Sequence, residues 1–336
     1  ARLQHTWMTG GGTDASRMYG HSASQAVLMA HPRSTVHITG GGFVHNPGKA
    51  VGVLEGTVTL LGVVISHCDV GVEATRGAVT VVDCDIFAIP DDDGALEDDD
   101  NDGMHLTDWA FDNAAAVVAR SRVSMGDDDG IDHDHAFLVV EETLIDSFSH
   151  EGIAVSGMNH KTLRHGSVFV RDVVVSNCMQ GIENGYGAAT LSVVSALLLR
   201  NAVGLRYGDE YAWGHSGTLA AEGVLVVESG DTPLLNEFPE APHSRPDLVD
   251  IACSLTHQPH LDAQAGLAEA EAQRLFACGQ CSLCESEAEG DGAPARRVGR
   301  ERNGAGGEEE VGRECAWPVF CAALGWYRGA SSGESI

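Results

Sequence analysis

The sequence has few basic and few aromatic side chains. Its 336 residues include 20 Lys and Arg against 49 Asp and Glu, which gives a formal net charge of -29, and only 6% of the chain is aromatic. This excess of negative charge argues against nucleic acid and against anionic membrane surfaces as partners. It favours cations as partners, or high solubility alone.

Long apolar runs and glycosylation signals are also missing. No stretch of about 18 apolar residues occurs, so no segment is expected to enter a membrane. No Asn-x-Ser/Thr sequon occurs, so N-glycosylation is not indicated. The chain starts at Ala1 without a signal peptide, and we expect it to be a mature form or a fragment.

Glycine is abundant, and it recurs in a repeat of about 22 residues. The segments TVTLLGVVISHCDVGVEATRG (57–77) and SVFVRDVVVSNCMQGIENGYG (167–187) align without a gap, and each has an apolar anchor at its fourth position. The anchors are Ile38, Leu60, Val81, Val118, Val140, Val170, Val193 and Ala221. A second apolar residue follows each anchor after five positions: Phe43, Ile65, Ile86, Val123, Ile145, Val175, Leu198 and Val226.

A Gly-apolar pair follows most anchors after a further short segment. The pairs are Gly71-Val72, Gly94-Ala95, Gly130-Ile131, Gly152-Ile153, Gly181-Ile182 and Gly204-Leu205. The first coil has Ala50-Val51 instead of a Gly-apolar pair. Within each unit the apolar residues alternate with polar ones, as short strands do. One unit cannot bury its apolar face alone, but stacked units can. The sequence therefore predicts an all-β fold, a parallel β-helix of about eight coils with insertions on one flank.

A leucine-rich repeat is the competing interpretation, and its Leu-x-x-Leu-x-Leu-x-x-Asn pattern is absent. We divide the chain into four parts. Residues 1–35 are expected to form an N-terminal cap and an irregular first coil, and residues 36–261 the β-helix. Residues 262–284 are expected to form an alanine-rich helix and a Cys-x-x-Cys-x-x-Cys segment. Residues 285–336 are expected to be a disordered linker with a short cysteine-containing tail.

The segment MGDDDGIDHDHA (125–136) is unusually acidic. In the predicted register, Asp91–Asp93 lie beside Asp127–Asp129 at strand spacing, and His150 and Glu151 lie on the next coil. Two carboxylates about 5 Å apart repel by roughly 3 kcal/mol at an effective dielectric constant near 20. No Lys or Arg occupies these positions, and Ca²⁺ accepts six to eight oxygen ligands. The predicted Ca²⁺ ligands are Asp91, Asp92, Asp93, Asp127, Asp128, Asp129, Asp132 and Glu151.

Two other interpretations of these acidic turns stay open. The carboxylates can be solvated and point apart, or they can form a catalytic cluster. A Zn²⁺ site made of His133, His135 and His150 is less favoured, because alternating residues of a strand point to opposite faces.

With these residues in hand, the chain resembles the right-handed parallel β-helix repeat proteins of the pectate-lyase-like superfamily over about 240 residues. The segments GDDDGIDHDHA, SHEGIAVSG, GIENGYG and GLRYGDEY look closest to β-helix domains found beside CotH-like modules in secreted proteins. The resemblance implies right-handed winding and an extracellular or cell-surface location.

The same resemblance suggests catalytic residues for the case that the chain is an enzyme. Polygalacturonase-type enzymes place acids and a histidine on neighbouring coils, and Asp127, Asp128 and His150 match these positions. Their Arg-x-Lys is missing, and Lys161 and Arg164 do not reproduce it. Pectate lyases need Ca²⁺ and an arginine base, and Arg206 is the only basic residue of the Gly-apolar segments. Mannuronan epimerases carry a Tyr-Gly-x-Asp-Pro-His element, which this sequence lacks.

Aromatic and cysteine residues give further expectations. Tyr207, Tyr211 and Trp213 are suited to stacking on sugar rings, or else their loop packs back onto the coil. Cys68, Cys84 and Cys178 are expected to be small buried side chains. The tail cysteines are expected to form disulfides, with Zn²⁺ binding as the alternative and Cys253 as a spare partner; they are Cys278, Cys281, Cys284, Cys315 and Cys321.

The leading hypothesis is a cell-surface or extracellular β-helix module that binds Ca²⁺ through stacked Asp turns. It would serve in carbohydrate binding or structural assembly, with polysaccharides, other matrix proteins or further copies of itself as partners. The alternative is a polysaccharide lyase or glycoside hydrolase that acts on an acidic polysaccharide. A basic residue facing the acids would favour the enzyme.

Overall fold

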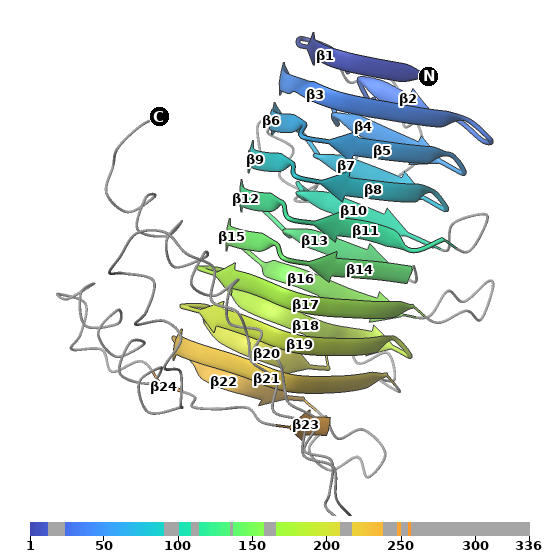
Figure 1. The fold of residues 1–336 in the computed structure, drawn as a ribbon. Coiled ribbons are helices and arrows are strands. Elements are labelled where there is room, and N and C mark those ends of the chain that lie inside the picture. Colours follow the sequence, from blue (N-terminus) through green and yellow to red (C-terminus); the bar gives the residue numbers. More distant parts are fainter. Residues whose placement is uncertain are drawn as a thin grey trace, which may run out of the picture. The chain divides into compact units, whose positions relative to one another are not determined.

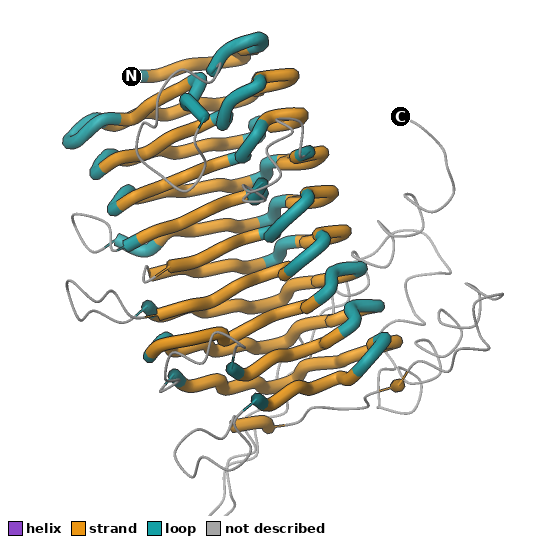
Figure 2. Tube along the Cα trace, turned by 180° about the vertical axis from the view of Figure 1, so that it is seen from behind, coloured by secondary structure: helices purple, strands orange, loops and turns teal. Residues whose placement is uncertain are grey.

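A computed structural model describes residues 1–12, 24–90, 101–108, 114–134, 137–157, 166–208, 217–237, 247–249 and 255–256. These residues form β-strands joined by turns, in one 15-stranded and one 9-stranded sheet whose strands all pair in parallel (Figure 1). No helix occurs among the described residues, as the tube in Figure 2 shows, and so none that would cross a membrane. The all-β parallel β-helix is therefore confirmed.

The 15-stranded sheet covers two sides of each coil. Its strands are β1 (Arg2–Met8), β3 (Thr35–Asn46), β5 (Thr57–Leu61), β6 (Val64–Cys68), β8 (Ala78–Val82), β9 (Asp85–Ile89), β11 (Ala116–Ala119), β12 (Arg122–Gly126), β14 (Phe137–Glu141), β15 (Leu144–Phe148), β17 (Ser167–Ser176), β19 (Thr190–Leu199), β21 (Thr218–Ser229), β23 (Asp247–Val249) and β24 (Leu255–Thr256). The long strands β3, β17, β19 and β21 run around the corner between the two sides, which joins them into one sheet.

The 9-stranded sheet forms the third side. Its strands are β2 (Leu28–Ala30), β4 (Val51–Leu54), β7 (Val72–Thr75), β10 (Met104–Thr107), β13 (Ile131–Asp134), β16 (Glu151–Gly157), β18 (Gln180–Gly187), β20 (Val203–Tyr207) and β22 (Thr232–Asn236). Successive strands of this sheet come from successive coils, so residues about one repeat apart in sequence lie side by side.

Single residues with left-handed backbone make the corners between the first two sides. Two positions after each anchor the φ angle is positive, at Asp83 (54°), Arg120 (47°), Glu142 (50°) and Asp172 (54°), for example. Such a conformation costs a non-glycine residue about 1 kcal/mol or more. The burial of the coil on both sides offsets this cost.

The predicted register is confirmed on both sides of the 15-stranded sheet. Ile38 pairs with Leu60, Leu60 with Val81, and the series continues to the pair of Val193 with Ala221. The second apolar series also stacks in register, from the pair of Phe43 with Ile65 to that of Leu198 with Val226. These side chains form one continuous core.

One coil of the 9-stranded sheet differs from its predicted register. Met104 pairs with both Val72 and Ile131, so Gly103-Met104 takes the position that we assigned to Gly94-Ala95. The prediction was wrong because the extra residues of this coil precede the Gly-apolar pair. Gly94 and Ala95 lie outside the described residues.

Close backbone contact explains the glycine of each pair. A Cβ atom on Gly103 would lie 2.5 Å from the carbonyl oxygen of Gly130, and one on Gly130 would lie 2.5 Å from that of Gly152. Only glycine permits this approach. The glycine column therefore fixes how neighbouring coils stack at the start of β7, β10, β13, β16, β18 and β20.

The other sequence expectations have mixed outcomes. Cys68, Cys84 and Cys178 are buried free cysteines, as predicted. Within residues 1–35, β1 pairs with β3 and β2 with β4, so this segment adds strands to both sheets. Residues 262–336 lie outside the described residues, and so do Cys253 and all the tail cysteines.

Candidate functional site

Polar side chains follow the outer face of the 9-stranded sheet in two adjacent columns. The first column holds the residue that precedes the column glycine in successive coils, and the second holds the residue two positions after that glycine. We call them together the polar ladder. The first column is Asp102, Asp129, Glu151 and Gln180. The second is Glu73, His105, Asp132, Ala154, Glu183 and Arg206.

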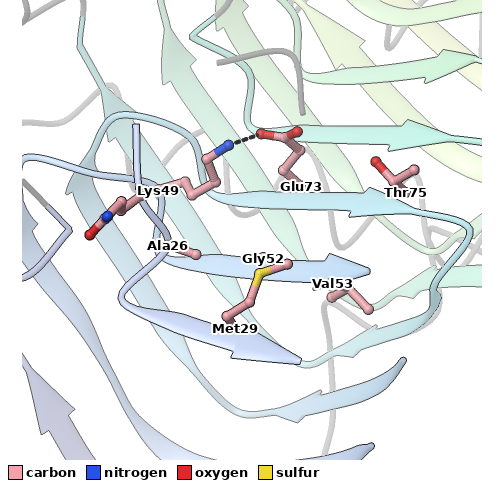
Figure 3. A pocket seen from close by; sticks show the side chains of 8 residues that line it. Ala26, Met29, Lys49, Gly52, Val53, Glu73 and Thr75 are labelled. Atoms are coloured by element: carbon pink, nitrogen blue, oxygen red, sulfur yellow. Dashed lines mark hydrogen bonds and ion pairs between the residues drawn. The ribbon is translucent and has the colours of Figure 1, made fainter. Parts of the chain in front are cut away.

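A basic residue pairs with a glutamate at each end of this ladder. At one end Lys49 forms an ion pair with Glu73, and both side chains are buried (Figure 3). At the other end Arg206 donates hydrogen bonds to Gln180 at 3.1 Å and to Glu183 at 3.0 Å. Histidines and carboxylates occupy the middle.

The first middle cluster consists of Asp102, His105 and Asp132. Nδ1 of His105 lies 2.6 Å from Oδ2 of Asp132 and 3.3 Å from Oδ2 of Asp102. Burial raises the pKa of Asp102 to about 7, although its contact with His105 acts in the opposite direction. Burial alone would lower the pKa of His105, but the charge of Asp132 and contacts with both carboxylates hold it well above its ordinary value.

The second middle cluster consists of Asp128, Asp129, His150 and Glu151. Nδ1 of His150 lies 2.5 Å from Oε2 of Glu151, 3.4 Å from Oδ1 of Asp128 and 3.6 Å from Oδ1 of Asp129. Contacts with Asp128 and Glu151 raise the pKa of His150 to about 10, so its ring is cationic at neutral pH. Burial, followed by the charge of Glu151, raises the pKa of Asp129 well above its ordinary value. Asp129 therefore holds its proton more tightly than an ordinary carboxyl group does.

The raised pKa values predict that the protein loses stability as pH increases. The folded state holds protons on Asp102, Asp129 and the two histidines that the unfolded chain releases at lower pH. Unfolding then releases protons between about pH 4 and pH 10, so the free energy of unfolding falls with rising pH. We expect a decrease on the order of 1–3 kcal/mol between about pH 5 and pH 9, measured by urea denaturation. An Asp102→Asn variant should show a smaller decrease, and a steeper one would contradict this origin.

A third polar group lies further along the same strands. Tyr186 donates a hydrogen bond to Oδ1 of Asp134 at 3.4 Å, and Ser156 donates one to the same oxygen. Burial and the charge of Asp134 raise the pKa of Tyr186 to about 12. Its hydroxyl thus stays protonated and can donate a hydrogen bond. Tyr186 lies on β18, which pairs with β16, the strand that begins at Glu151.

The structure brings together only part of the predicted acidic block. Asp128, Asp129, His150 and Glu151 lie together as expected, and Asp132 belongs to the first cluster. Asp127 is exposed and accepts a hydrogen bond from Ser149 at 3.5 Å. Asp91, Asp92 and Asp93 lie outside the described residues.

The stacking of Asp91–Asp93 on Asp127–Asp129 was predicted in the wrong register. Asn101 and Asp102 precede Gly103, so they occupy the neighbouring positions instead. The backbone NH of Asp129 donates to Oδ1 of Asp102 at 3.2 Å, which ties the two coils together. In the second column the sequence singled out Asp132 and Arg206, but it did not predict Glu73, His105 or Glu183, because only the residues before the glycine were aligned between coils.

The structure tests only one of the three predicted carbohydrate-binding residues. Tyr207 is fully buried in the core, and its hydroxyl donates to the carbonyl of Gly217 at 2.7 Å. It cannot stack on a sugar, and this part of the prediction is wrong. Tyr207 alternates with the outward Arg206, so its ring points inwards. Tyr211 and Trp213 lie outside the described residues.

A cavity of about 210 Å³ lies at the Lys49 end of the ladder (Figure 3). Its lining combines polar and apolar side chains: Gln25, Ala26, Met29, Lys49, Gly52, Val53, Glu73 and Thr75. A water molecule takes about 30 Å³ in the liquid, so the space corresponds to about seven waters. The cavity is a small recess that adjoins the ladder through Glu73.

No protein-family model matches the chain, and a search of curated proteins gave no match. Among solved structures, the chain is similar to the periplasmic alginate epimerase AlgG, with a TM-score of 0.56 and 12% sequence identity. The similarity covers 76% of this chain and 60% of the AlgG chain. At this identity the similarity establishes the fold alone, a parallel β-helix.

Proposed function

We propose that the protein is an enzyme that cleaves an acidic polysaccharide by acid–base catalysis on the outer face of the 9-stranded sheet. The observation that carries the proposal is the second cluster, where cationic His150 contacts Glu151, Asp128 and Asp129, and where burial raises the pKa of Asp129. Strongly shifted pKa values that have specific charged causes are typical of catalytic sites. The outer sheet face is a surface along which an extended polymer can lie.

His150 supplies the basic residue that the enzyme interpretation requires. Its side chain is 45% exposed, unlike those of Asp129 and Glu151, which are buried. A cationic ring at the surface can bind the carboxylate of a uronic acid. In the same cluster, Asp129, whose pKa is raised, is the candidate acid, and the neighbouring Glu151 is the candidate base. Asp128 orients the His150 ring.

The two candidate reactions use this pair differently. A hydrolase would protonate the leaving oxygen from Asp129 and activate water with a second carboxylate. A lyase would use Glu151 to remove the proton next to the uronate carboxylate while His150 neutralises that carboxylate. A carbon–carbon double bond would then form as the glycosidic carbon–oxygen bond breaks, and Asp129 would protonate the leaving oxygen. Epimerisation, the activity in AlgG's name, is not our proposal for this chain, because the Tyr-Gly-x-Asp-Pro-His element is absent from the sequence.

The experiment is a panel of uronate-containing polysaccharides incubated with the purified chain. A hydrolase releases new reducing ends, and a lyase also creates an unsaturated product that absorbs ultraviolet light. We expect product from at least one acidic polymer and none from its carboxyl-reduced form, which lacks the group that His150 would bind. If no polymer yields product under metal-supplemented and metal-free conditions, the enzyme proposal fails.

A second candidate is a non-catalytic surface module that binds cations and takes part in carbohydrate binding or assembly. The clustering of carboxylates with histidines on one face favours it. Asp128, Asp129 and His150 lie close enough together to hold one cation, and Ca²⁺ is the ion that the sequence predicts for these acidic turns. Both candidates imply a location outside the cytoplasm, in line with the resemblance to domains that accompany CotH-like modules. Cation binding without any product would favour the module.

A further inference from the structure

We infer that Asp102, His105 and Asp132 form a binding site for a first-row divalent transition metal such as Mn²⁺. The inference goes beyond the proposed reaction and does not depend on it. It concerns the first cluster, which the acid–base roles above do not use.

The three ligand atoms have suitable positions. Nδ1 of His105, Oδ2 of Asp102 and Oδ2 of Asp132 all lie within 4.8 Å of one another, and Nδ1 is 3.3 and 2.6 Å from the two oxygens. Ligand atoms about 2.1 Å from a metal lie about 3.0–3.4 Å apart in octahedral or tetrahedral geometry. The His105–Asp102 distance lies within this range, and the His105–Asp132 distance would enter it if Asp132 moved outwards by a few tenths of an ångström.

The other nitrogen of His105 is in contact with a group that can set its tautomer. Nε2 lies 2.7 Å from Oγ1 of Thr107, two residues along the same strand. When Nε2 carries a hydrogen and donates it to Thr107, Nδ1 presents its lone pair to the two carboxylates. Metal-binding histidines are commonly held by such a hydrogen bond on the second nitrogen. Thr107 would therefore position the ring.

Asp102 provides an independent observation. Its side chain is 1% exposed, and its Oδ1 accepts the hydrogen bond from the backbone of Asp129. Its Oδ2 lies 3.3 Å from Nδ1 of His105 but accepts no well-aligned hydrogen bond from any of the described residues. A buried carboxylate oxygen without a donor is costly, and a cation at this position would remove that cost.

The ligand set indicates the class of metal. Ca²⁺ prefers six to eight oxygen ligands, whereas this cluster offers an imidazole and two carboxylates. Mixed nitrogen and oxygen ligands suit Mn²⁺, Fe²⁺ and Zn²⁺. Asp132 is 20% exposed, so the site opens to solvent on one side and leaves positions for water or a substrate oxygen.

The test uses Mn²⁺ alone, without polysaccharide. Zn²⁺ is unsuitable for the full chain, because Cys278, Cys281 and Cys284 offer it a thiolate site. Binding to the metal-stripped chain is measured by the loss of the free Mn²⁺ electron paramagnetic resonance signal. We expect His105→Gln and Asp132→Asn to weaken Mn²⁺ binding at least about a hundredfold, and Thr107→Val to weaken it by about tenfold.

The matched control is His31→Gln, which removes an exposed histidine outside both clusters and should leave Mn²⁺ affinity unchanged. Circular dichroism confirms that each variant is folded, and Asp132→Asn tests the site if His105→Gln does not fold. Equal Mn²⁺ affinity of the wild type and a folded His105→Gln or Asp132→Asn variant overturns the inference. Displacement of Mn²⁺ by an equal concentration of Ca²⁺ overturns the assigned metal class. Because no substrate is present, these outcomes are separate from failure of the proposed reaction.

Discussion

Replacement of Lys49 by Met should lower the free energy of unfolding by about 3–5 kcal/mol. The side chains of Lys49 and Glu73 are only 2% and 3% exposed, so the variant would leave a buried carboxylate without the cation that pairs with it. The flexible thioether of Met fills a similar volume, which limits any packing defect. Chemical denaturation of the wild type and the variant measures the difference.

Two further variants identify the cause. Lys49→Met combined with Glu73→Gln should recover much of the loss, because the unpaired charge is removed. Arg76→Met breaks the ion pair with Glu55 on the same sheet, where the two side chains are 49% and 31% exposed, and should cost less than about 1 kcal/mol. A Lys49→Met variant as stable as Arg76→Met would show that water or other groups solvate Glu73.

Replacement of Glu151 by Gln should reduce kcat/KM on the polysaccharide identified in the panel by about 10²–10⁴-fold. This prediction depends on the proposed function. Gln keeps the size of the side chain but cannot accept a proton, and it removes the charge that raises the pKa of Asp129. The acid–base pair would thus lose its base, and its acid would titrate at lower pH.

The control for this variant is Glu141→Gln, which changes a partly exposed glutamate that pairs with Arg171 in the 15-stranded sheet. It should keep wild-type activity. The pH–rate profile separates a catalytic from a structural role, because Glu151→Gln should shift the limb set by Asp129 to lower pH. Retention of full activity with an unchanged profile would show that catalysis does not involve this pair.

Much of the fold was predictable because the core of a β-helix repeats along the sequence. All anchors from Ile38 to Ala221 pair in the expected order, since an apolar residue at each anchor is required to fill the core. The Gly103-Met104 pair was missed for a physical reason. An insertion can enter a coil before or after its glycine. In a single sequence, Gly94 and Gly103 are equally acceptable as the column glycine, because each follows aspartate and precedes an apolar residue.

The candidate site was predictable only in part. The acids before Gly130 and the His150-Glu151 pair were found because they cluster in sequence. Lys49, Glu73 and His105 were not found, because they are isolated in sequence and meet only when the coils stack. Burial also reversed one expectation: Tyr207 looks like a surface aromatic next to Arg206, yet strand alternation turns its ring into the core.

The glycine column has a consequence for how this protein can diversify. Its backbone contacts fix the start of the six strands β7, β10, β13, β16, β18 and β20, so the two outward positions of these coils keep their places when the residues that occupy them change. A substitution such as that of Ala154, which separates Asp132 from Glu183, would add or remove one chemical group without disturbing neighbouring coils. Substitutions can thus change specificity one coil at a time. Insertion of a whole coil would move the two halves of the site apart by one strand spacing, and loss of a coil would bring them closer by the same distance.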